Sequence, residues 1–114
     1  LCQTVCPWNQ SRPRTPLSDP LGLRARLAKR EEWIAPTLEW ILSLDEDAFA
    51  KSTRRSAIRR SGHRGLIRNA LVAAGNARDP RLRGAIEKVV ESEDPLLREH
   101  ALWALAEYDK APDA

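Results

Sequence analysis

The sequence is poor in several residue types, and each shortage excludes a class of protein. It contains no methionine and only two cysteines, Cys2 and Cys6, in 114 residues. Two thiolates by themselves cannot fill the four ligand positions of a structural zinc site or an iron–sulfur cluster. No apolar run approaches the roughly 20 residues that cross a membrane, and the first residues lack the features of a signal peptide. We therefore expect a protein of the cytoplasm that makes no membrane contact.

Acidic residues are missing from residues 51–68, where His63 stands among seven cations. The cations are Lys51, Arg54, Arg55, Arg59, Arg60, Arg64 and Arg68. From Glu87 onward the charged residues are mostly acidic, and the net charge of the whole chain is +3. This separation of sign polarises the molecule, and its basic side is predicted to attract a polyanion.

The composition is that of a globular domain with an appendage. It is 42% hydrophobic and 31% charged, which is typical of soluble folded proteins. Residues 10–20 are rich in Pro, Ser, Thr and Arg, and this pattern indicates a linker. No later segment alternates with the period of a strand. The sequence therefore predicts an all-α domain over residues 21–114, preceded by an irregular tail over residues 1–20.

Proline and aspartate mark the expected helix starts. Asp19-Pro20 predicts a short helix through Leu23 and Leu27 to Trp33, and Pro36 fits the first turn of the next helix. Short connections predict that helices consecutive in the sequence run antiparallel. Further N-caps are predicted at Asp45, Asp79 and Asp94.

An internal repeat is visible among the last helices. A helix is expected from His63 to Ala74, ended by Gly75-Asn76. Ile67-Arg68 recurs 30 residues later as Leu97-Arg98. With one residue inserted, the segment 69–71 would correspond to 100–102. A helix pair that recurs at this period is typical of a short α-solenoid.

Two stretches carry a resemblance to a known family. CQTVCPWN, residues 2–9, resembles the end of the second cysteine motif of tRNA epoxyqueuosine reductases, which are cobalamin-dependent iron–sulfur enzymes. SAIRRSGHRGLIRNALVAAGN, residues 56–76, and LLREHALWAL, residues 96–105, resemble their C-terminal HEAT-like repeats. The order and approximate spacing also match, and the resemblance is weakest over residues 11–34.

The resemblance implies an oxidoreductase that converts epoxyqueuosine to queuosine at the wobble position of tRNA anticodons. Such enzymes bind cobalamin in an N-terminal domain and two 4Fe-4S clusters in a ferredoxin-like insert. The present sequence lacks the counterpart of the N-terminal domain and of the first cysteine motif. It therefore resembles the C-terminal portion, with residues 1–20 as the end of the ferredoxin-like segment, and is expected to be inactive alone.

The role of the cysteines depends on this resemblance. In the intact enzyme it implies that Cys2 and Cys6 are thiolate ligands of different 4Fe-4S clusters. The spacing alone leaves two alternatives open, a Cys2–Cys6 disulfide across a short loop or two free thiols. In this chain we expect neither a 4Fe-4S cluster nor cobalamin to be held stably.

The resemblance also implies two partners, the tRNA anticodon stem-loop and the missing N-terminal catalytic domain, for a chain that is itself expected to be a monomer. Arginine binds phosphate oxygens in a bidentate manner, and no acidic residue lies near residues 54–64 in the sequence. We therefore predict tRNA contacts at Arg54, Arg55, Arg59, Arg60, Arg64, Arg68 and Asn69. The alternative for Arg68 and Arg98 is a structural role between repeat helices.

No catalytic constellation of residues is present, so no catalytic residue is predicted. Trp33 and Trp40 are expected in the core. Trp103 lies about 120° from the apolar stripe of its helix, so it either packs on another element or waits for a partner. His100 is a candidate contact or a hydrogen-bonded structural residue. An alternative function is a HEAT-like protein-interaction module whose basic face meets an acidic partner.

Overall fold

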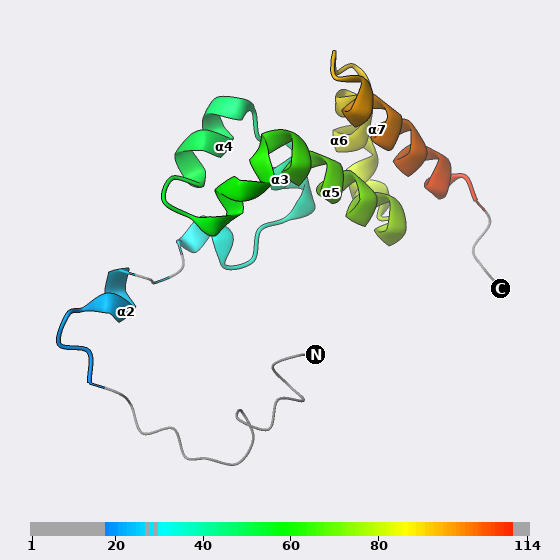
Figure 1. Ribbon diagram of the computed structural model, residues 1–114. Helices are drawn as coiled ribbons and strands as arrows, with labels where there is room; N and C mark the ends of the chain where they lie inside the picture. Colours follow the sequence, from blue (N-terminus) through cyan, green and yellow to red (C-terminus); the bar gives the residue numbers. More distant parts are fainter. Residues whose placement is uncertain (1–17, 27, 29, 111–114) are drawn as a thin grey trace, which may run out of the picture. The chain divides into compact units, whose positions relative to one another are not determined.

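The computed structural model describes residues 18–26, 28 and 30–110 and divides the chain into two units, Leu1–Arg30 and Glu31–Ala114 (Figure 1). These residues form helices and turns without a β-strand, which confirms the all-α class. Among the described residues, no helix is long and apolar enough to span a bilayer. Cys2 and Cys6 lie outside the described residues, so their predicted role is not tested.

The first unit contains one short described helix, α2 (Leu23–Arg26). Asp19 caps it, because its two carboxylate oxygens accept hydrogen bonds from Leu23 N and Arg24 N at 2.7 and 2.8 Å. The expected continuation to Trp33 is wrong, since α2 ends at Arg26 and Trp33 belongs to a separate 3-10 helix, η2 (Glu31–Trp33). Leu23 remains 45% exposed, so little apolar burial supports a longer helix.

The second unit begins with η2, which is followed by two short capped helices, α3 (Leu38–Leu42) and α4 (Glu46–Ser52). The predicted N-cap Asp45 is confirmed by its bond to Ala48 N at 2.7 Å. Helix α3 begins later than expected, because Thr37 rather than Pro36 stands at its start and accepts a bond from Trp40 N at 3.2 Å.

The two tryptophans of this region are not core residues. The rings of Trp33 and Trp40 meet edge to face at 5.1 Å, and both side chains are half-buried. The Trp33 indole donates to the carbonyl of Ser52 at 3.1 Å, which ties the end of α4 to this pair. Only Trp40 packs against the main core. The polar indole nitrogen explains the position at the edge, where it finds an acceptor.

The longest of the described helices, α5 (Gly62–Ala77), extends beyond its predicted end. Gly75 is buried within the helix, and a Cβ placed there would lie 2.8 Å from Trp103 Cζ3 and 3.0 Å from Ala104 Cα. The glycine thus permits a close helix contact and does not terminate the helix. Arg78 takes the left-handed C-cap conformation instead, at φ 49°, so the expected C-cap role of Asn76 is also wrong.

Two further helices follow, α6 (Arg83–Val90) and α7 (Pro95–Tyr108), and a 3-10 turn, η4 (Pro80–Leu82), leads into α6. The predicted N-caps are confirmed. Asp79 accepts from Arg81 N at 3.0 Å and Asp94 accepts from Leu96 N at 2.9 Å. Proline occupies the first turn after each cap, where its missing N–H costs nothing.

Helices α5 and α7 run parallel and stack as equivalent helices of a repeat. Arg64 contacts Asp94 near the start of both helices, and Gly75 contacts Ala104 near their ends. These pairs are 30 and 29 residues apart, which agrees with the 30-residue period of the sequence. Helix α6 connects the two and packs on α7 (Figure 1).

The expected one-residue insertion in the repeat is wrong. At a constant offset of 30, fully buried Leu71 corresponds to fully buried Ala101, and fully buried Ala74 to fully buried Ala104. The insertion would have matched Leu71 with Leu102, which is 52% exposed. An inserted residue rotates all following side chains by about 100° around a helix, so a continuous α7 keeps the simple offset.

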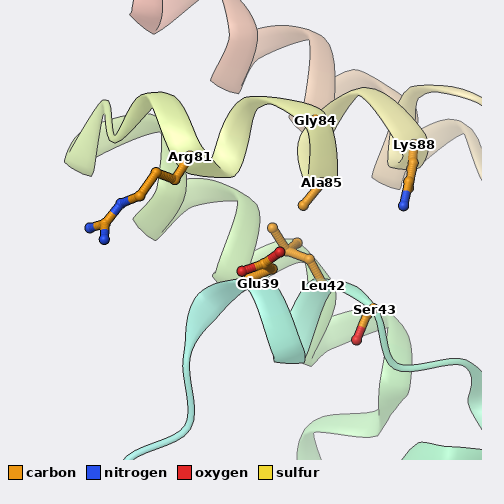
Figure 2. A pocket seen from close by; sticks show the side chains of 7 residues that line it. All are labelled: Glu39, Leu42, Ser43, Arg81, Gly84, Ala85 and Lys88. Carbon is orange, nitrogen blue, oxygen red and sulfur yellow. The ribbon is translucent and has the colours of Figure 1, made fainter.

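The main core lies among α3, α5, α6 and α7, with Leu71 and Ile86 completely buried. A hollow of about 290 Å³ separates part of α3 from α6 (Figure 2). Its lining includes Leu42 and Ala85, with Glu39 and Arg81 at one end.

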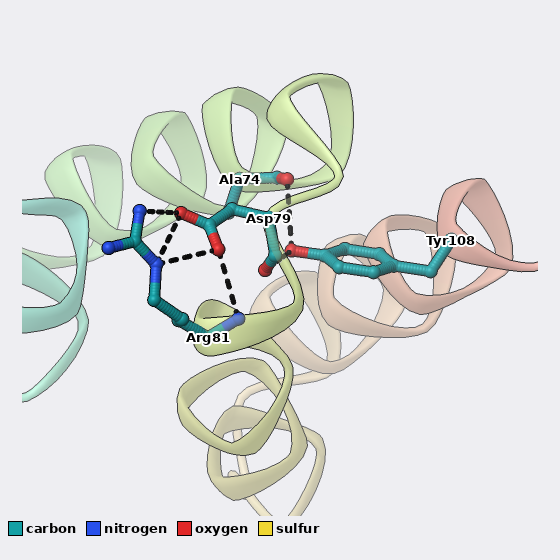
Figure 3. Close-up of polar contacts among 4 residues, drawn as sticks. All are labelled: Ala74, Asp79, Arg81 and Tyr108. Atoms are coloured by element: carbon teal, nitrogen blue, oxygen red, sulfur yellow. Dashed lines mark hydrogen bonds and ion pairs between the residues drawn. The ribbon is translucent and has the colours of Figure 1, made fainter. Parts of the chain in front are cut away.

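A tyrosine joins the ends of the repeat helices (Figure 3). The hydroxyl of Tyr108 lies 2.9 Å from the carbonyl oxygen of Asp79 and 3.3 Å from that of Ala74. Burial raises the pKa of the Tyr108 hydroxyl, so it remains a donor at neutral pH. The carboxylate of Asp79 meanwhile binds the Arg81 side chain. The short loop between α5 and η4 is thereby also bonded to α7.

Candidate nucleic-acid interface

Most of the predicted contact residues lie on one irregular segment, residues 53–61, which we call the arginine turn. Thr53 is its buried anchor, because it is completely buried and its hydroxyl donates to the carbonyl of Phe49 at 2.6 Å. Arg55 then takes a left-handed conformation at φ 59°. Ser56 caps the 3-10 helix η3 (Ala57–Ser61), which leads directly into α5.

The arginine turn presents its cations to solvent. The side chains of Arg54, Arg55, Arg59 and Arg60 are all exposed. No carboxylate of the described residues lies within 4.0 Å of the guanidinium groups of Arg55, Arg59 or Arg60. Three guanidinium groups on one short segment without a counter-charge there attract phosphate oxygens.

His63, to which the sequence alone assigned no contact, fixes the exit of this turn. His63, in the first turn of α5, lies 2.6 Å through Nε2 from the carbonyl oxygen of Leu44. Because a carbonyl only accepts, Nε2 carries the proton in this bond. The ring also meets Phe49 edge to face at 5.9 Å. Together with Thr53, His63 holds the arginine turn between α4 and α5.

Arg64 differs from the arginines of the turn because an acidic residue neutralises it. Its Nε and Nη2 donate to the two oxygens of Asp94 at 2.5 and 3.1 Å. This pair raises the pKa of the Arg64 guanidinium and lowers the pKa of the Asp94 carboxyl. The expectation that no acid lies near Arg64 is therefore wrong, since its partner is 30 residues away and only the stacking of α5 on α7 brings them together.

Arg68 and Asn69 form a polar pair on the exposed side of α5. The Arg68 guanidinium donates to Asn69 Oδ1 at 3.1 and 3.3 Å, and both residues are exposed. Arg98, expected to bridge repeat helices, makes no ion pair with the described residues; Arg64 has that role instead. The pair of Arg68 and Asn69 remains accessible from solvent.

A second surface feature lies between α5 and α7, a hollow of about 300 Å³ lined by Val72, Glu99, His100 and Trp103. Of the two alternatives expected for Trp103, the structure shows packing on another element, because the indole lies over Gly75 of α5. Trp103 nevertheless remains 38% exposed. The Nδ1 atom of His100 donates to the Leu96 carbonyl oxygen at 2.9 Å. Two features of the sequence pointed to this hollow. Trp103 lies away from the apolar stripe of its helix, and Gly75 lies within α5 and not at its end.

The described residues supply no metal centre. No group of three or more His, Cys, Asp or Glu side chains within 18–26, 28 and 30–110 is arranged to hold an ion. The hollow between α3 and α6 has a lining of mixed charge, because Glu39 and Lys88 both line it and Arg81 pairs with Asp79 (Figures 2 and 3). The arrangement of charge favours the arginine turn as the site of polyanion contact.

Comparison with known proteins confirms the resemblance to epoxyqueuosine reductases. The chain is 38% identical over 108 residues to the epoxyqueuosine reductase of Xanthomonas campestris pv. campestris. It is 39% identical over 107 residues to that of Escherichia coli and 38% over 107 residues to that of Vibrio cholerae.

These alignments cover 94%, 93% and 93% of this chain but 28%, 26% and 27% of the respective relatives. The chain thus spans about a quarter of the length of the curated relatives it matches. No protein-family model matches the sequence, and no solved structure is significantly similar to it.

Proposed function

We propose that this chain is the C-terminal part of an epoxyqueuosine reductase and that its helices form a HEAT-like surface for the tRNA anticodon stem-loop. The observation that carries the tRNA proposal is the arginine turn, whose exposed Arg55, Arg59 and Arg60 have no carboxylate partner among the described residues. The names of the relatives support a role in queuosine modification of tRNA. The parallel stacking of α5 and α7 supports the repeat architecture.

In the intact enzyme, the reaction would be the reduction of epoxyqueuosine to queuosine at the wobble base, in the cytoplasm. Cys2 and Cys6 would supply thiolate ligands to 4Fe-4S clusters, and cobalamin would be bound by the remainder of the enzyme. A 4Fe-4S cluster takes four thiolates, so this chain would supply one ligand to each of two clusters and the remainder of the enzyme the others. We assign no catalytic step to this chain, whose own contribution is to bind and orient the tRNA.

The proposed contact is electrostatic in the arginine turn and continues onto α5. Guanidinium groups of the turn neutralise phosphates of the stem-loop and fix its register without reading sequence. Arg68 and Asn69 extend this surface along α5, two helical turns past the end of the arginine turn. Arg64 is a weaker contact, because phosphate must compete with the carboxylate of Asp94 for its guanidinium.

A salt titration tests this surface. The probe is an RNA hairpin with the sequence of a tRNA anticodon stem-loop, and the measurement is fluorescence anisotropy over a range of salt concentrations. The triple variant Arg55→Asn, Arg59→Gln, Arg60→Gln should weaken binding and reduce the slope of log K against log salt by roughly 2–3, about 0.7–0.9 for each lost phosphate contact. Asparagine is chosen at Arg55 because it tolerates the left-handed conformation.

A matched variant removes three cations elsewhere, with Arg81→Gln, Arg83→Gln and Lys88→Gln. It has the same net charge but leaves the arginine turn intact, so its salt slope should stay close to that of the unmodified chain. Equal losses in both triple variants would show a diffuse charge effect. An unchanged affinity in the arginine-turn variant would remove the tRNA proposal and favour the protein-interaction module.

The proposed lack of activity is tested separately. The chain, supplied with cobalamin and a reductant, is incubated with tRNA that contains epoxyqueuosine, beside the Escherichia coli enzyme as a positive control. Nucleoside mass spectrometry should detect queuosine only in the control. Turnover by the chain alone would show that it contains a catalytic centre and would contradict its assignment as a binding portion.

A further inference from the structure

The hollow between α5 and α7 lies outside the arginine turn and has a different chemistry. Its volume is about 300 Å³, and its lining is Val72 from α5 with Glu99, His100 and Trp103 from α7. Val72 and Trp103 remain 37% and 38% exposed. The hollow thus combines accessible apolar surface with two polar side chains.

The packing of α5 against α7 holds the aromatic side of this hollow in place. Trp103 Cζ3 lies 2.8 Å from the position that a Cβ of residue 75 would occupy, so the indole reaches α5 only because residue 75 is glycine. The backbone of Ala104 approaches the same point to 3.0 Å. An aromatic ring fixed in this way loses little conformational entropy when another ring stacks on it.

The polar side chains of the hollow are hydrogen-bond acceptors. The Nδ1 atom of His100 donates to the carbonyl oxygen of Leu96 at 2.9 Å, so Nε2 of the neutral imidazole is the acceptor. The exposed carboxylate of Glu99 also only accepts when ionised. A ligand that satisfies both must present neighbouring N–H donors beside an apolar ring. Phosphate fails this requirement because it carries charge of the same sign as Glu99.

One cationic residue for the remainder of a nucleotide, Arg68, is close by. Arg68 precedes Val72 by four residues, which is one turn of α5 and a rise of about 6 Å. Its guanidinium is exposed and held by Asn69 Oδ1 at 3.1 Å. A nucleotide with its base in the hollow would therefore place its backbone toward Arg68.

We propose that this hollow binds one unpaired guanine base of an RNA strand, with the base against Trp103 and its donor edge at Glu99 and His100. Guanine presents an N–H and an adjacent amino group on one edge, whereas adenine and cytosine present only an amino group and uracil a single N–H. Unpaired bases are the usual targets of sequence-specific RNA recognition by stacking and edge contacts. This inference rests on the proposed tRNA binding.

Binding of short RNA hairpins to the complete chain tests the proposal. The hairpins share one stem and a uridine loop, in which a single position carries guanine, inosine, adenine or uridine. Inosine lacks only the amino group of guanine. The guanine hairpin should bind most tightly, and Trp103→Ala should weaken its binding by about 5- to 150-fold, the range known for loss of one base–aromatic stack. Leu102→Ala, an exposed apolar truncation on the same helix, is the control.

A second variant leaves the packing of α7 intact. Glu99→Gln replaces a charged acceptor by a neutral amide oxygen, so it should reduce the preference for guanine over inosine while the affinity for the all-uridine loop stays unchanged. Glu93→Gln, which removes an exposed carboxylate before α7, should keep the preference. A guanine preference that is undiminished in both Glu99→Gln and Trp103→Ala would overturn the assignment of the hollow.

The outcomes separate this inference from the proposed function. If the arginine-turn variant loses affinity but neither the loop base nor Trp103→Ala matters, the hollow does not bind the base and the tRNA surface remains. If the unmodified chain binds none of the hairpins at low salt, both proposals are wrong. Circular dichroism of Trp103→Ala establishes that any loss of binding is measured on a folded chain.

Discussion

The arginine turn and the stacked repeat helices differ in whether their arginines are paired with acidic residues. In the repeat, Arg64 pairs with Asp94 at 2.5 Å and Arg78 pairs with Glu107 at 3.6 Å. Each pair links α5 or its C-cap to α7 or its N-cap. In the turn, the guanidinium groups of Arg59 and Arg60 have no such partner among the residues described. Charge serves packing in the first region and remains available for a ligand in the second.

The two regions also differ in burial. Leu71 of α5 and Ile86 of α6 are completely buried, and Ala101 and Ala104 of α7 complete the contact. In the arginine turn the one fully buried residue is Thr53, whose hydroxyl is satisfied by the Phe49 carbonyl. Substitutions in the repeat should therefore alter stability, whereas substitutions of the turn arginines should alter binding and leave stability nearly unchanged.

Removal of the Leu71 side chain should give the largest loss of stability. Leu71→Ala deletes a fully buried side chain and leaves a cavity between α5 and its neighbours, at a cost of about 2–5 kcal/mol. That is a large share of the stability of a small domain, which is ~5–15 kcal/mol. Urea unfolding followed by circular dichroism measures it.

Leu102→Ala is the matched control, since Leu102 is 52% exposed on α7. Its effect should lie within about 0.5 kcal/mol, as is usual at the surface. Equal losses for the two variants would mean that α5 and α7 do not stack at the 30-residue offset.

The contact at Gly75 can be tested with two identical substitutions. Gly75→Ala and Gly84→Ala gain similar helix propensity, up to about 1 kcal/mol. A Cβ at residue 75 meets Ala104 Cα at 3.0 Å, whereas one at residue 84 has no atom within 4 Å. Overpacking costs about 1–3 kcal/mol, so Gly75→Ala should be less stable than Gly84→Ala by that amount. Thermal melting of both variants is the measurement, and equal melting temperatures would refute the close approach.

The successes of the sequence analysis were local. Asp45, Asp79 and Asp94 were identified as N-caps because an N-cap needs only its own side chain and the next few backbone amides. The all-α class followed from the absence of strand periodicity. The 30-residue period also emerged correctly, since the apolar stripes of α5 and α7 share it.

The errors arose where a distant residue decides the local structure. Gly75 followed by Asn76 is locally typical of a helix end. The glycine instead lies inside α5, because α7 packs so closely there that a Cβ would not fit. Arg64 seemed unpaired because Asp94 is 30 residues away. The hollow at Trp103 could not be derived from one helix, since its other wall is Val72 of α5. Only the stacking of the helices specifies these three features.

The ion pair between Arg64 and Asp94 should give the smallest effect, and its sign follows from the pKa. A hydrogen bond from Arg64 lowers the pKa of Asp94 in the folded state, below an unfolded value of about 3.9. The pair therefore stabilises the fold above about pH 4 and is lost as the pH falls through the folded pKa. Arg64→Gln should lower the melting temperature slightly at neutral pH and flatten its decline below about pH 5.

Two other carboxyl groups add to the same decline in the unmodified chain, because Arg81 lowers the pKa of Asp79 and Lys110 that of Glu107. The Arg64→Gln curve will therefore be shallower than the wild-type curve but still fall in acid. Arg98→Gln provides the control, since it removes an exposed arginine of α7 that forms no ion pair with the described residues. If both variants follow the wild-type curve, the pair contributes nothing to stacking, and the contrast between paired and available arginines would rest on the ion pairs of Arg78, Arg81 and Arg83.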